Sequence, residues 1–270
     1  MMEQNSKRLG FQMERIDTEH IHKQIASAFG GEFMPDNQPG TTSWPPAFIH
    51  EPSGQRFRYI PGGQFRMGLS EGEEAAARKL CNPFPANIGE MRPVRLIKIS
   101  PFLMGERPVL TRELGGETGN YPNAAAYVSF DTARKHAHRY GMTLPSEAQW
   151  EYACRAGTET LFTFGDRLPE ESELAEWLTF DFSAGYGRAN GFGMYGLFIG
   201  EWCSDVFTDS YEPDLGKSND GPRVVRGGGA YFWPWQDQEW VWCMSAMRCP
   251  STDLPDGECG FRFVRNLPDS

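Results

Sequence analysis

The sequence lacks any long uninterrupted apolar run and has little positive charge. No stretch of about 18 apolar residues occurs, so no membrane-spanning helix is expected. The first residues are polar, without the apolar core of a secretory signal, which predicts a cytoplasmic, reducing location. The net charge is −10, whereas a duplex-binding protein usually has a basic surface. Nucleic acid and membranes are therefore not expected as partners, and no feature of the sequence sets an oligomeric state.

The sequence also lacks the spaced motifs of common metal and nucleotide sites. It contains no H-E-x-x-H, no paired C-x-x-C and no P-loop pattern. His136 and His138 are two apart on a predicted helix and so point to different faces, which makes them poor co-ligands. In a reducing compartment the cysteines are predicted to be free, mostly buried thiols. They are Cys81, Cys154, Cys203, Cys243, Cys249 and Cys259.

Glycine, proline and aromatic residues are abundant. The chain has 30 Gly and 20 Pro, and aromatic residues make up 13% of it. Such a composition predicts many turns, little regular structure and loops packed around rings. We predict one α+β domain over residues 56–270, preceded by a polar arm and connector at 1–55. Within that arm, Ile16, Ile21, Ile25 and Phe29 have a helical spacing.

Local patterns predict the main elements of the domain. The segment 71–80 is Ala-containing and charged, as in a short helix. A second helix is predicted from an Asp131 N-cap to Gly141, and a third from a Ser146 N-cap to Gly157. Strands are predicted on both sides of the Pro-Gly-Gly turn at 61–63. Further strands are predicted within 93–110, with Val94, Leu96, Ile97 and Ile99 on a buried face.

Six segments resemble, in order, the formylglycine-generating enzyme (sulfatase-modifying factor) family. They are PGGQFRMG at 61–68, RPVRLIKISPFLMGERPVLTREL at 92–114, AYVSFDTARKHAHRYGMTLPSEAQWEYACRAG at 126–157, EWCSD at 201–205, RVVRGGG at 223–229 and GFRFV at 260–264. Six matching segments in register are a specific signal. The resemblance covers roughly residues 56–265 and implies a C-type-lectin-like fold with few helices and strands, long ordered loops and a surface set by its C-terminal third.

Several matched residues have a structural explanation without chemistry. Arg155 and Arg262 are expected to satisfy interior carboxylates or loop carbonyls with their forks of donors. Gly227, Gly228 and Gly229 are expected to allow a tight backbone turn.

The sequence departs from the family where the resemblance places its metals. The family enzyme uses two cysteines that hold copper, and their places fall here at Phe232 and Trp240. The resemblance also places a structural calcium site within 190–205, where Gly196 replaces an acidic residue. We therefore predict that the catalytic cysteine pair and both metal sites are lost. Cys243 and Cys249 would lie roughly 20 Å apart along a strand, and whether Cys259 approaches either one is left open.

An aromatic segment at 230–248 lies where the resemblance places the floor of the family's active site. It is either core packing or a recognition surface whose rings and carboxylates favour a cationic or polar ligand, with Trp235 and Trp240 the more exposed pair. The predicted ligand-binding residues are Tyr231, Trp233, Trp235, Asp237, Glu239, Trp240, Trp242 and Arg248.

Three functions remain open. The first, which we favour, is a non-catalytic recognition protein for a peptide, a protein or a small polar ligand. One form of it is a variable protein of a diversity-generating retroelement, although the many Trp codons argue against adenine-directed variation. The second is a divergent O₂-dependent oxidase or hydroxylase that modifies a protein or natural product. The third is orthodox formylglycine generation.

Overall fold

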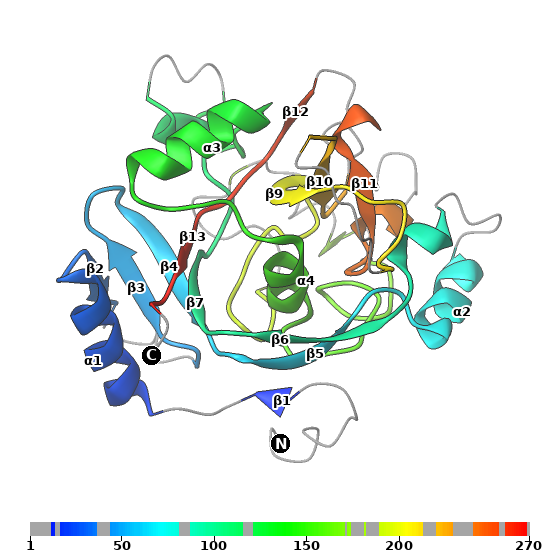
Figure 1. Ribbon diagram of the computed structural model, residues 1–270, viewed down its shortest axis with the longest axis horizontal. Coiled ribbons are helices and arrows are strands. Elements are labelled where there is room, and N and C mark those ends of the chain that lie inside the picture. Colours follow the sequence, from blue (N-terminus) through cyan, green and yellow to red (C-terminus); the bar gives the residue numbers. More distant parts are fainter. Residues whose placement is uncertain are drawn as a thin grey trace.

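The structure is a computed structural model of the 270-residue chain, shown in Figure 1. It describes residues 12–13, 17–36, 44–80, 87–115, 121–170, 172–173, 181, 189–212, 220–228, 240–253 and 257–268. Helices and strands within these ranges are short, as predicted from the glycine and proline content.

The largest described sheet has five antiparallel strands and lies at the left of Figure 1. Its order is β13 (Val264–Asn266), β7 (Phe102–Gly105), β4 (Gln55–Ile60), β3 (Ala47–His50) and β2 (Phe33–Pro35). The C-terminal strand β13 therefore lies beside β7, far from it in sequence, and the two are paired from Val264↔Met104 to Asn266↔Phe102.

Three smaller antiparallel sheets complete the described strands. The first has the order β1 (Gln12–Met13), β5 (Gly63–Met67) and β6 (Arg95–Ile99). The second has the order β11 (Arg248–Pro250), β10 (Arg223–Arg226) and β9 (Glu201–Val206). The third joins β12 (Glu258–Cys259) to β8 (Val128–Ser129). The predicted strands β4 and β5 flank the Pro-Gly turn but belong to different sheets.

The packed body begins well before Arg56. Helix α1 (Thr18–Phe29) buries Ile21, Ile25 and Phe29, which confirms the helical spacing. Strands β2 and β3 then pair with each other and with β4. The segment that we predicted to be an irregular connector thus supplies two strands of the largest sheet. Short, proline-interrupted strands of this kind have little local signal, because sheet pairing rather than local propensity stabilises them.

Three further α-helices lie in the described ranges. Helix α2 (Glu71–Leu80) has the predicted bounds. Helix α3 (Phe130–Arg139) begins two residues earlier than predicted, because Ser129 rather than Asp131 is its N-cap and accepts from the backbone N–H of Thr132. Helix α4 (Glu147–Arg155) has the predicted N-cap, Ser146. Short 3₁₀ helices are η1 (Ile88–Met91), η2 (Thr111–Glu113), η3 (Trp240–Cys243) and η4 (Ser251–Asp253). None of the described helices has the length and apolar character needed to cross a membrane.

Helix α4 lies at the centre of the molecule in Figure 1 and packs against β5, β6, β9 and β10. Its charged residues Glu147, Glu151 and Arg155 are buried together with its apolar ones. Charges placed in such an interior must be paired, so the ionic contacts of α4 position the surrounding sheets.

Strand β6 differs from the prediction at one residue. Its alternation places Ile99 inward, but Leu96 is 65% exposed. The register explains this, because Leu96 pairs with the exposed Arg66 whereas Ile97 pairs with the buried Phe65. Neighbouring residues in a strand face opposite sides, so the predicted buried face could not include both Leu96 and Ile97.

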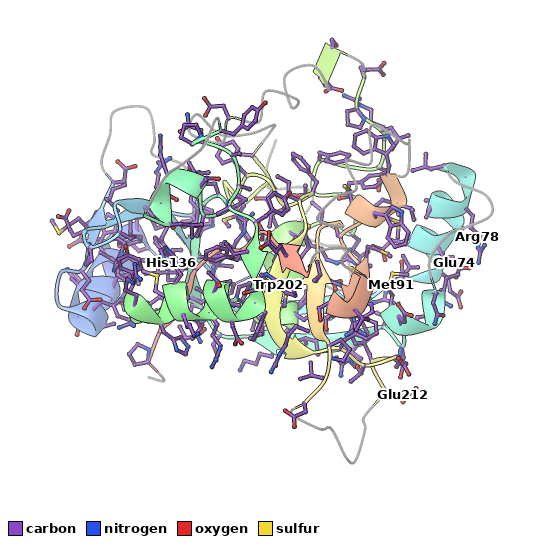
Figure 2. All side chains as sticks on the ribbon, turned by 90° about the horizontal axis from the view of Figure 1, so that it is seen from above. Glu74, Arg78, Met91, His136, Trp202 and Glu212 are labelled. Carbon is purple, nitrogen blue, oxygen red and sulfur yellow. The ribbon has the colours of Figure 1, made fainter. Side chains whose placement is uncertain are left out.

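Two buried histidines predict a loss of stability in mild acid. Figure 2 shows His136 among the packed side chains, and His50 is likewise buried. Burial is the largest influence and lowers the pKa of both rings. Glu32 opposes it at His50 and Glu113 at His136, while Arg265 and Arg139 add to it. The folded state thus favours the neutral rings, and the unfolded chain takes up protons first as the pH falls through about 6.5.

We expect the urea midpoint to fall between pH 7 and about 5.5, above the range in which carboxylates titrate. The double variant His50→Gln/His136→Gln should show a smaller fall, whatever its stability at pH 7. An unchanged pH dependence in that variant would show that other groups are responsible.

Candidate functional site

The chain turns sharply where β10 ends, at Gly227 and Gly228. Both have left-handed backbone angles, with φ of +88° and +118°. A Cβ atom on Gly227 would collide with the carbonyl oxygen of Ile199 and lie 2.9 Å from Cζ2 of Trp150. The predicted tight turn is confirmed for these two glycines, while Gly229 lies outside the described residues. The turn fixes the point at which the aromatic segment leaves the sheet.

The aromatic segment re-enters the described structure at η3. Trp240 is only 5% exposed, and its ring meets that of Phe164 edge-on, with centroids 6.2 Å apart and an interplanar angle of 85°. Cys243 is fully buried in the same apolar cluster, and Trp242 is half-buried at its edge. The prediction that Trp240 is one of the exposed rings is therefore wrong, because this cluster encloses it.

Two buried thiols, Cys243 at the end of η3 and Cys154 on α4, are held as protonated groups. The Cys243 Sγ donates to the carbonyl oxygen of Phe198 at 3.2 Å, and the Cys154 Sγ donates to the Ser245 hydroxyl at 3.6 Å. Burial raises the pKa of Cys154 to about 11 and that of Cys243 well above its ordinary value. Soft metal binding and nucleophilic attack both need the thiolate, so neither chemistry is favoured at these positions.

The three C-terminal cysteines do not meet at one point. Cys249 and Cys259 pack against one apolar cluster, whereas Cys243 belongs to another. Burial raises the pKa of Cys259, and the nearby Cys249 adds to the effect. All three are free thiols, as predicted.

The loss of the family's copper-binding cysteine pair stays a prediction. The family resemblance places the second cysteine at Trp240, whose indole offers only an N–H donor. Phe232, at the place of the first, lies outside the described residues. Within the part of the chain that the structure describes, no three or more His, Cys, Asp or Glu side chains are grouped to hold a metal ion.

Asn190 organises the region in which the resemblance places calcium. Its Nδ2 donates to the carbonyl oxygen of Ala153 at 2.7 Å, and its Oδ1 accepts from the backbone N–H groups of Phe192 and Met194. A single amide thus closes this turn and ties it to the end of α4. The loss of calcium binding at Gly196 stays a prediction.

Buried ion pairs join β10 and the residues after η3 to α4. Glu151 accepts hydrogen bonds from Nη2 of Arg226 and, at 2.8 Å, from Nε of Arg155. Burial alone would raise the pKa of Glu151, but the two guanidinium groups outweigh it and hold that pKa below its ordinary value. Arg226 also donates to the carbonyl oxygens of Ser245 and Ala246. Both ends of the aromatic segment are therefore fixed to the same helix.

Arg248 forms a second such anchor. Its Nε and Nη2 donate to the two carboxylate oxygens of Glu147 at 2.6 and 3.0 Å. Its Nη1 donates to the carbonyl oxygens of Glu90 and Thr208, and its guanidinium lies 4.7 Å from the ring centre of Tyr211. Because this side chain is only 2% exposed and its donors are used in the interior, we assign Arg248 to the scaffold and withdraw it from the predicted ligand surface.

The predicted interior roles of Arg155 and Arg262 are confirmed. The Nε and Nη2 atoms of Arg262 donate to the two carboxylate oxygens of Glu201 at 2.7 and 2.6 Å. The indole of Trp150 donates to the same carboxylate at 2.8 Å. Arg155 donates to Glu73 at 2.7 Å, in addition to its hydrogen bond with Glu151 of the same helix. These pairs link elements that are distant in the sequence.

Most of the predicted ligand-binding residues lie outside the described part of the chain. Their placement stays a prediction for Tyr231, Trp233, Trp235, Asp237 and Glu239. The structure brings Trp240, Trp242 and Arg248 into the interior or to its edge. The described geometry thus provides two fixed ends and an apolar base, with any ligand contact left to the residues between the ends.

Comparison with known proteins agrees with this scaffold. Residues 111–267, more than half of the chain, match the family model of the sulfatase-modifying factor enzyme 1-like domain. The formylglycine-generating enzyme of Streptomyces coelicolor is 28% identical over 135 residues, which are 41% of this chain and 43% of that protein. The enzyme of Mus musculus is 30% identical over 135 residues, which are 42% of this chain and 36% of that protein. The chain therefore spans less than half the length of these curated relatives.

One solved structure resembles most of the chain in its fold. PvdO from Pseudomonas aeruginosa matches with a TM-score of 0.57 and 21% identity, covering 80% of this chain and 95% of that one. Treponema denticola variable protein 1 matches with a TM-score of 0.49 and 17% identity, covering 78% and 94%. The PvdO match shows a shared fold and confirms the predicted fold class. The family match and the buried Arg–carboxylate scaffold together identify this chain as a member of the sulfatase-modifying factor enzyme 1-like family.

Proposed function

We propose that this chain is a non-catalytic recognition protein built on a sulfatase-modifying factor scaffold. In this proposal the aromatic segment, residues 230–248, binds a peptide, a protein or a small polar ligand. Its rings would stack on the ligand, and Asp237 and Glu239 would favour a positively charged group.

One observation carries the proposal. Trp240, where we predict the place of the second catalytic cysteine, is buried in an apolar cluster. Cys243 of the same cluster, and Cys154, whose charge acts on Cys243, are buried and have raised pKa values. Soft-metal redox chemistry needs accessible thiolates, so this arrangement supports binding rather than oxidation.

The anchored ends of the segment also support a binding role. Gly227 and Gly228 fix its start, and Arg226 ties the residues that follow η3 to α4. A recognition surface gains affinity when its supports are rigid, because less conformational freedom is lost on binding. The same supports would let the residues between the ends vary without disturbing the core.

The proposal predicts selective binding of cations through the rings. An oligolysine peptide and tetramethylammonium should change the tryptophan fluorescence, whereas an oligoglutamate peptide should not. The double variant Trp235→Ala/Asp237→Asn should weaken oligolysine binding about tenfold or more. Tyr121→Ala, which removes an exposed ring elsewhere, is the matched control and should bind normally.

Three outcomes would contradict this function. Equal binding of oligolysine by the double variant would exclude the aromatic segment as the site. Stoichiometric copper or iron with O₂ consumption on a thiol substrate would favour the divergent oxidase. Conversion of a sulfatase peptide cysteine to formylglycine would establish the orthodox enzyme. The retroelement version has its own genetic test, a near-copy of the coding segment for 223–262 beside a reverse transcriptase gene.

A further inference from the structure

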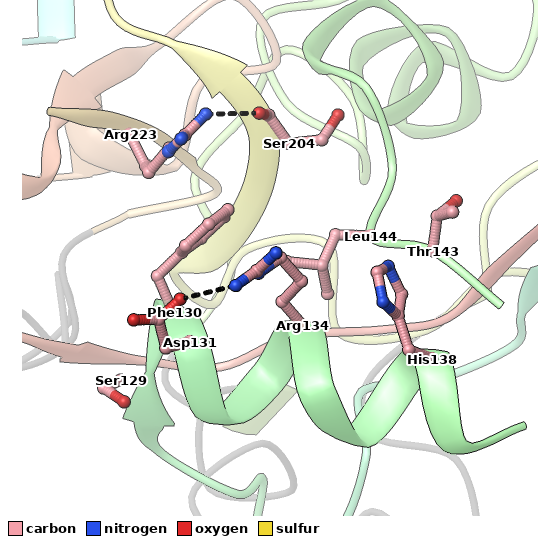
Figure 3. A pocket seen from close by; sticks show the side chains of 9 residues that line it. All are labelled: Ser129, Phe130, Asp131, Arg134, His138, Thr143, Leu144, Ser204 and Arg223. Carbon is pink, nitrogen blue, oxygen red and sulfur yellow. Dashed lines mark hydrogen bonds and ion pairs between the residues drawn. The ribbon is translucent and has the colours of Figure 1, made fainter. Parts of the chain in front are cut away.

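A second candidate site lies between helix α3 and the β9–β10 edge. Figure 3 shows an open pocket there, with α3 on one side and Ser204 and Arg223 on the other. Its volume is about 600 Å³, which is within the usual range for small-molecule sites. The pocket was not foreseen from the sequence, since its walls come from three separate segments.

One face of α3 supplies the polar wall. Asp131, Arg134 and His138 line the pocket, and their spacing of three and four residues places them on the same side of the helix. Arg134 donates to Asp131 at 3.1 Å, but the two side chains are 49% and 69% exposed. Exposed pairs of this kind contribute about 0–1 kcal/mol, so Arg134 can turn to a bound anion at little cost.

The opposite wall presents a second guanidinium in a fixed position. The Arg223 guanidinium stacks 4.7 Å from the ring centre of Phe130 and donates to the carbonyl oxygen of Ser204 at 3.0 Å. Its backbone N–H donates to the Ser251 hydroxyl at 2.9 Å. Arg223 is therefore held at the pocket wall by contacts on both its side chain and its backbone.

The floor of the pocket is apolar and rigid. Leu144 is only 4% exposed, and the neighbouring Thr143 makes two backbone hydrogen bonds with Val264 of β13. The backbone N–H of Ser204 donates to the carbonyl oxygen of Pro145 at 2.8 Å, which joins this floor to the β9 wall. A preformed pocket with fixed walls loses little entropy when a ligand enters.

The described lining of the pocket is more basic than acidic, whereas the chain as a whole is acidic. Among the described residues that line it, two carry a guanidinium, one an imidazole and one a carboxylate, although the chain has a net charge of −10. Guanidinium forks match the oxygens of carboxylates and phosphates, while Phe130 and Leu144 offer apolar surface beside them. We propose that this pocket binds a small organic anion, a carboxylate or phosphate ester that carries an apolar group.

The anion pocket is separate from the aromatic segment. Arg223 begins β10, whereas the turn at Gly227 follows the other end of that strand. Four residues of strand separate the two points by roughly 13 Å, and no lining residue of the pocket comes from 227–248. The two proposals can therefore fail independently.

Binding of two aromatic anions tests the pocket. Phenyl phosphate and benzoate, titrated into the full chain and followed by amide NMR shifts, should bind with a dissociation constant on the order of 1 mM. The shifts should map to residues of α3 and to the first residues of β10. Tighter binding of phenyl phosphate would identify a phosphate ester as the ligand class, and tighter binding of benzoate a carboxylate; either order supports the site.

Charge-removing variants separate the pocket from the general surface. Arg134→Gln and Arg223→Gln should each weaken binding about tenfold, the loss expected for one charge-assisted hydrogen bond. Arg139→Gln is the matched control, because Arg139 is an exposed α3 residue outside the lining. Since Arg134 is itself largely exposed, its variant is expected to fold even if Arg223→Gln does not.

Several results would overturn the anion site. One is equal binding of neutral benzyl alcohol, which would show a purely apolar pocket. Another is unchanged affinity in Arg134→Gln, or an equal loss in Arg139→Gln. Absence of binding by both anions up to about 20 mM, an affinity weaker than about −2.3 kcal/mol, would also exclude it.

Discussion

Replacing Glu201 by glutamine is expected to lower the free energy of unfolding by about 3–5 kcal/mol. Glu201 and Arg262 are both fully buried and share two hydrogen bonds, and Trp150 donates to the same carboxylate. The substitution keeps the shape of the side chain but leaves the buried Arg262 charge without its carboxylate. Urea unfolding followed by tryptophan fluorescence measures the change.

The matched control is a carboxylate in an exposed pair. Glu19 lies 2.7 Å from Lys23 on α1, and both side chains are more than 70% exposed. Glu19→Gln should change the free energy of unfolding by less than about 1 kcal/mol. A similar small effect for Glu201→Gln would mean that water or a rearranged Arg262 compensates the buried charge, and the scaffold role assigned to this pair would be wrong.

Gly227→Ala is expected to lower the free energy of unfolding by about 3 kcal/mol or more. The left-handed φ of +88° is strained for any residue with a Cβ, at about 1–3 kcal/mol. In addition, the new methyl group would collide with the carbonyl oxygen of Ile199 and the ring of Trp150. Because both neighbours belong to the packed body, the turn itself must move, so the start of the aromatic segment would shift with it.

Gly54→Ala separates backbone strain from collision. Gly54 also has a left-handed φ, +67°, but nothing lies within 4 Å of its added Cβ. Its substitution should therefore cost only the conformational part, about 1 kcal/mol. Equal losses for the two variants would show that the close approach of Gly227 to Ile199 has no energetic weight.

Local sequence signals predicted the elements that they themselves stabilise. The Ala-containing run at 71–80 gave the bounds of α2, and the Ser146 N-cap gave the start of α4. The prediction for α3 was wrong by two residues, because Ser129 and Asp131 are both good caps and the structure uses the first. Capping and helix propensity act within a few residues, so one chain segment carries enough information.

Elements that depend on distant partners could not be predicted in the same way. Strands β2 and β3 were missed, since their stability comes from pairing with each other and with β4. The exposure of Leu96 was missed because the register between β5 and β6 decides which face is buried. The family resemblance predicted the fold class despite these errors, because it uses segments from the whole chain at once.

The candidate site was predicted in part. The tight turn at Gly227 and Gly228 and the interior roles of Arg155 and Arg262 are confirmed. The prediction that Trp240 is exposed is wrong, because its burial depends on contact with Phe164, which lies 76 residues earlier. The anion pocket had one local signal, the helical spacing of Asp131, Arg134 and His138. No local signal in the sequence indicated that Arg223 would form the opposite wall of this pocket.

The two anchors on α4 have a consequence for how this protein can change over time. Residues 229–239 run between Gly228 and Trp240, both of which are held by packed neighbours. The entropy of closing a connection grows only with the logarithm of its length, so three added residues cost about 0.2 kcal/mol. Loop closure therefore sets only a weak limit on the length of this connection. In the proposed recognition role, natural selection could change its length, and with it the specificity, while the buried ion pairs of α4 stay under constraint.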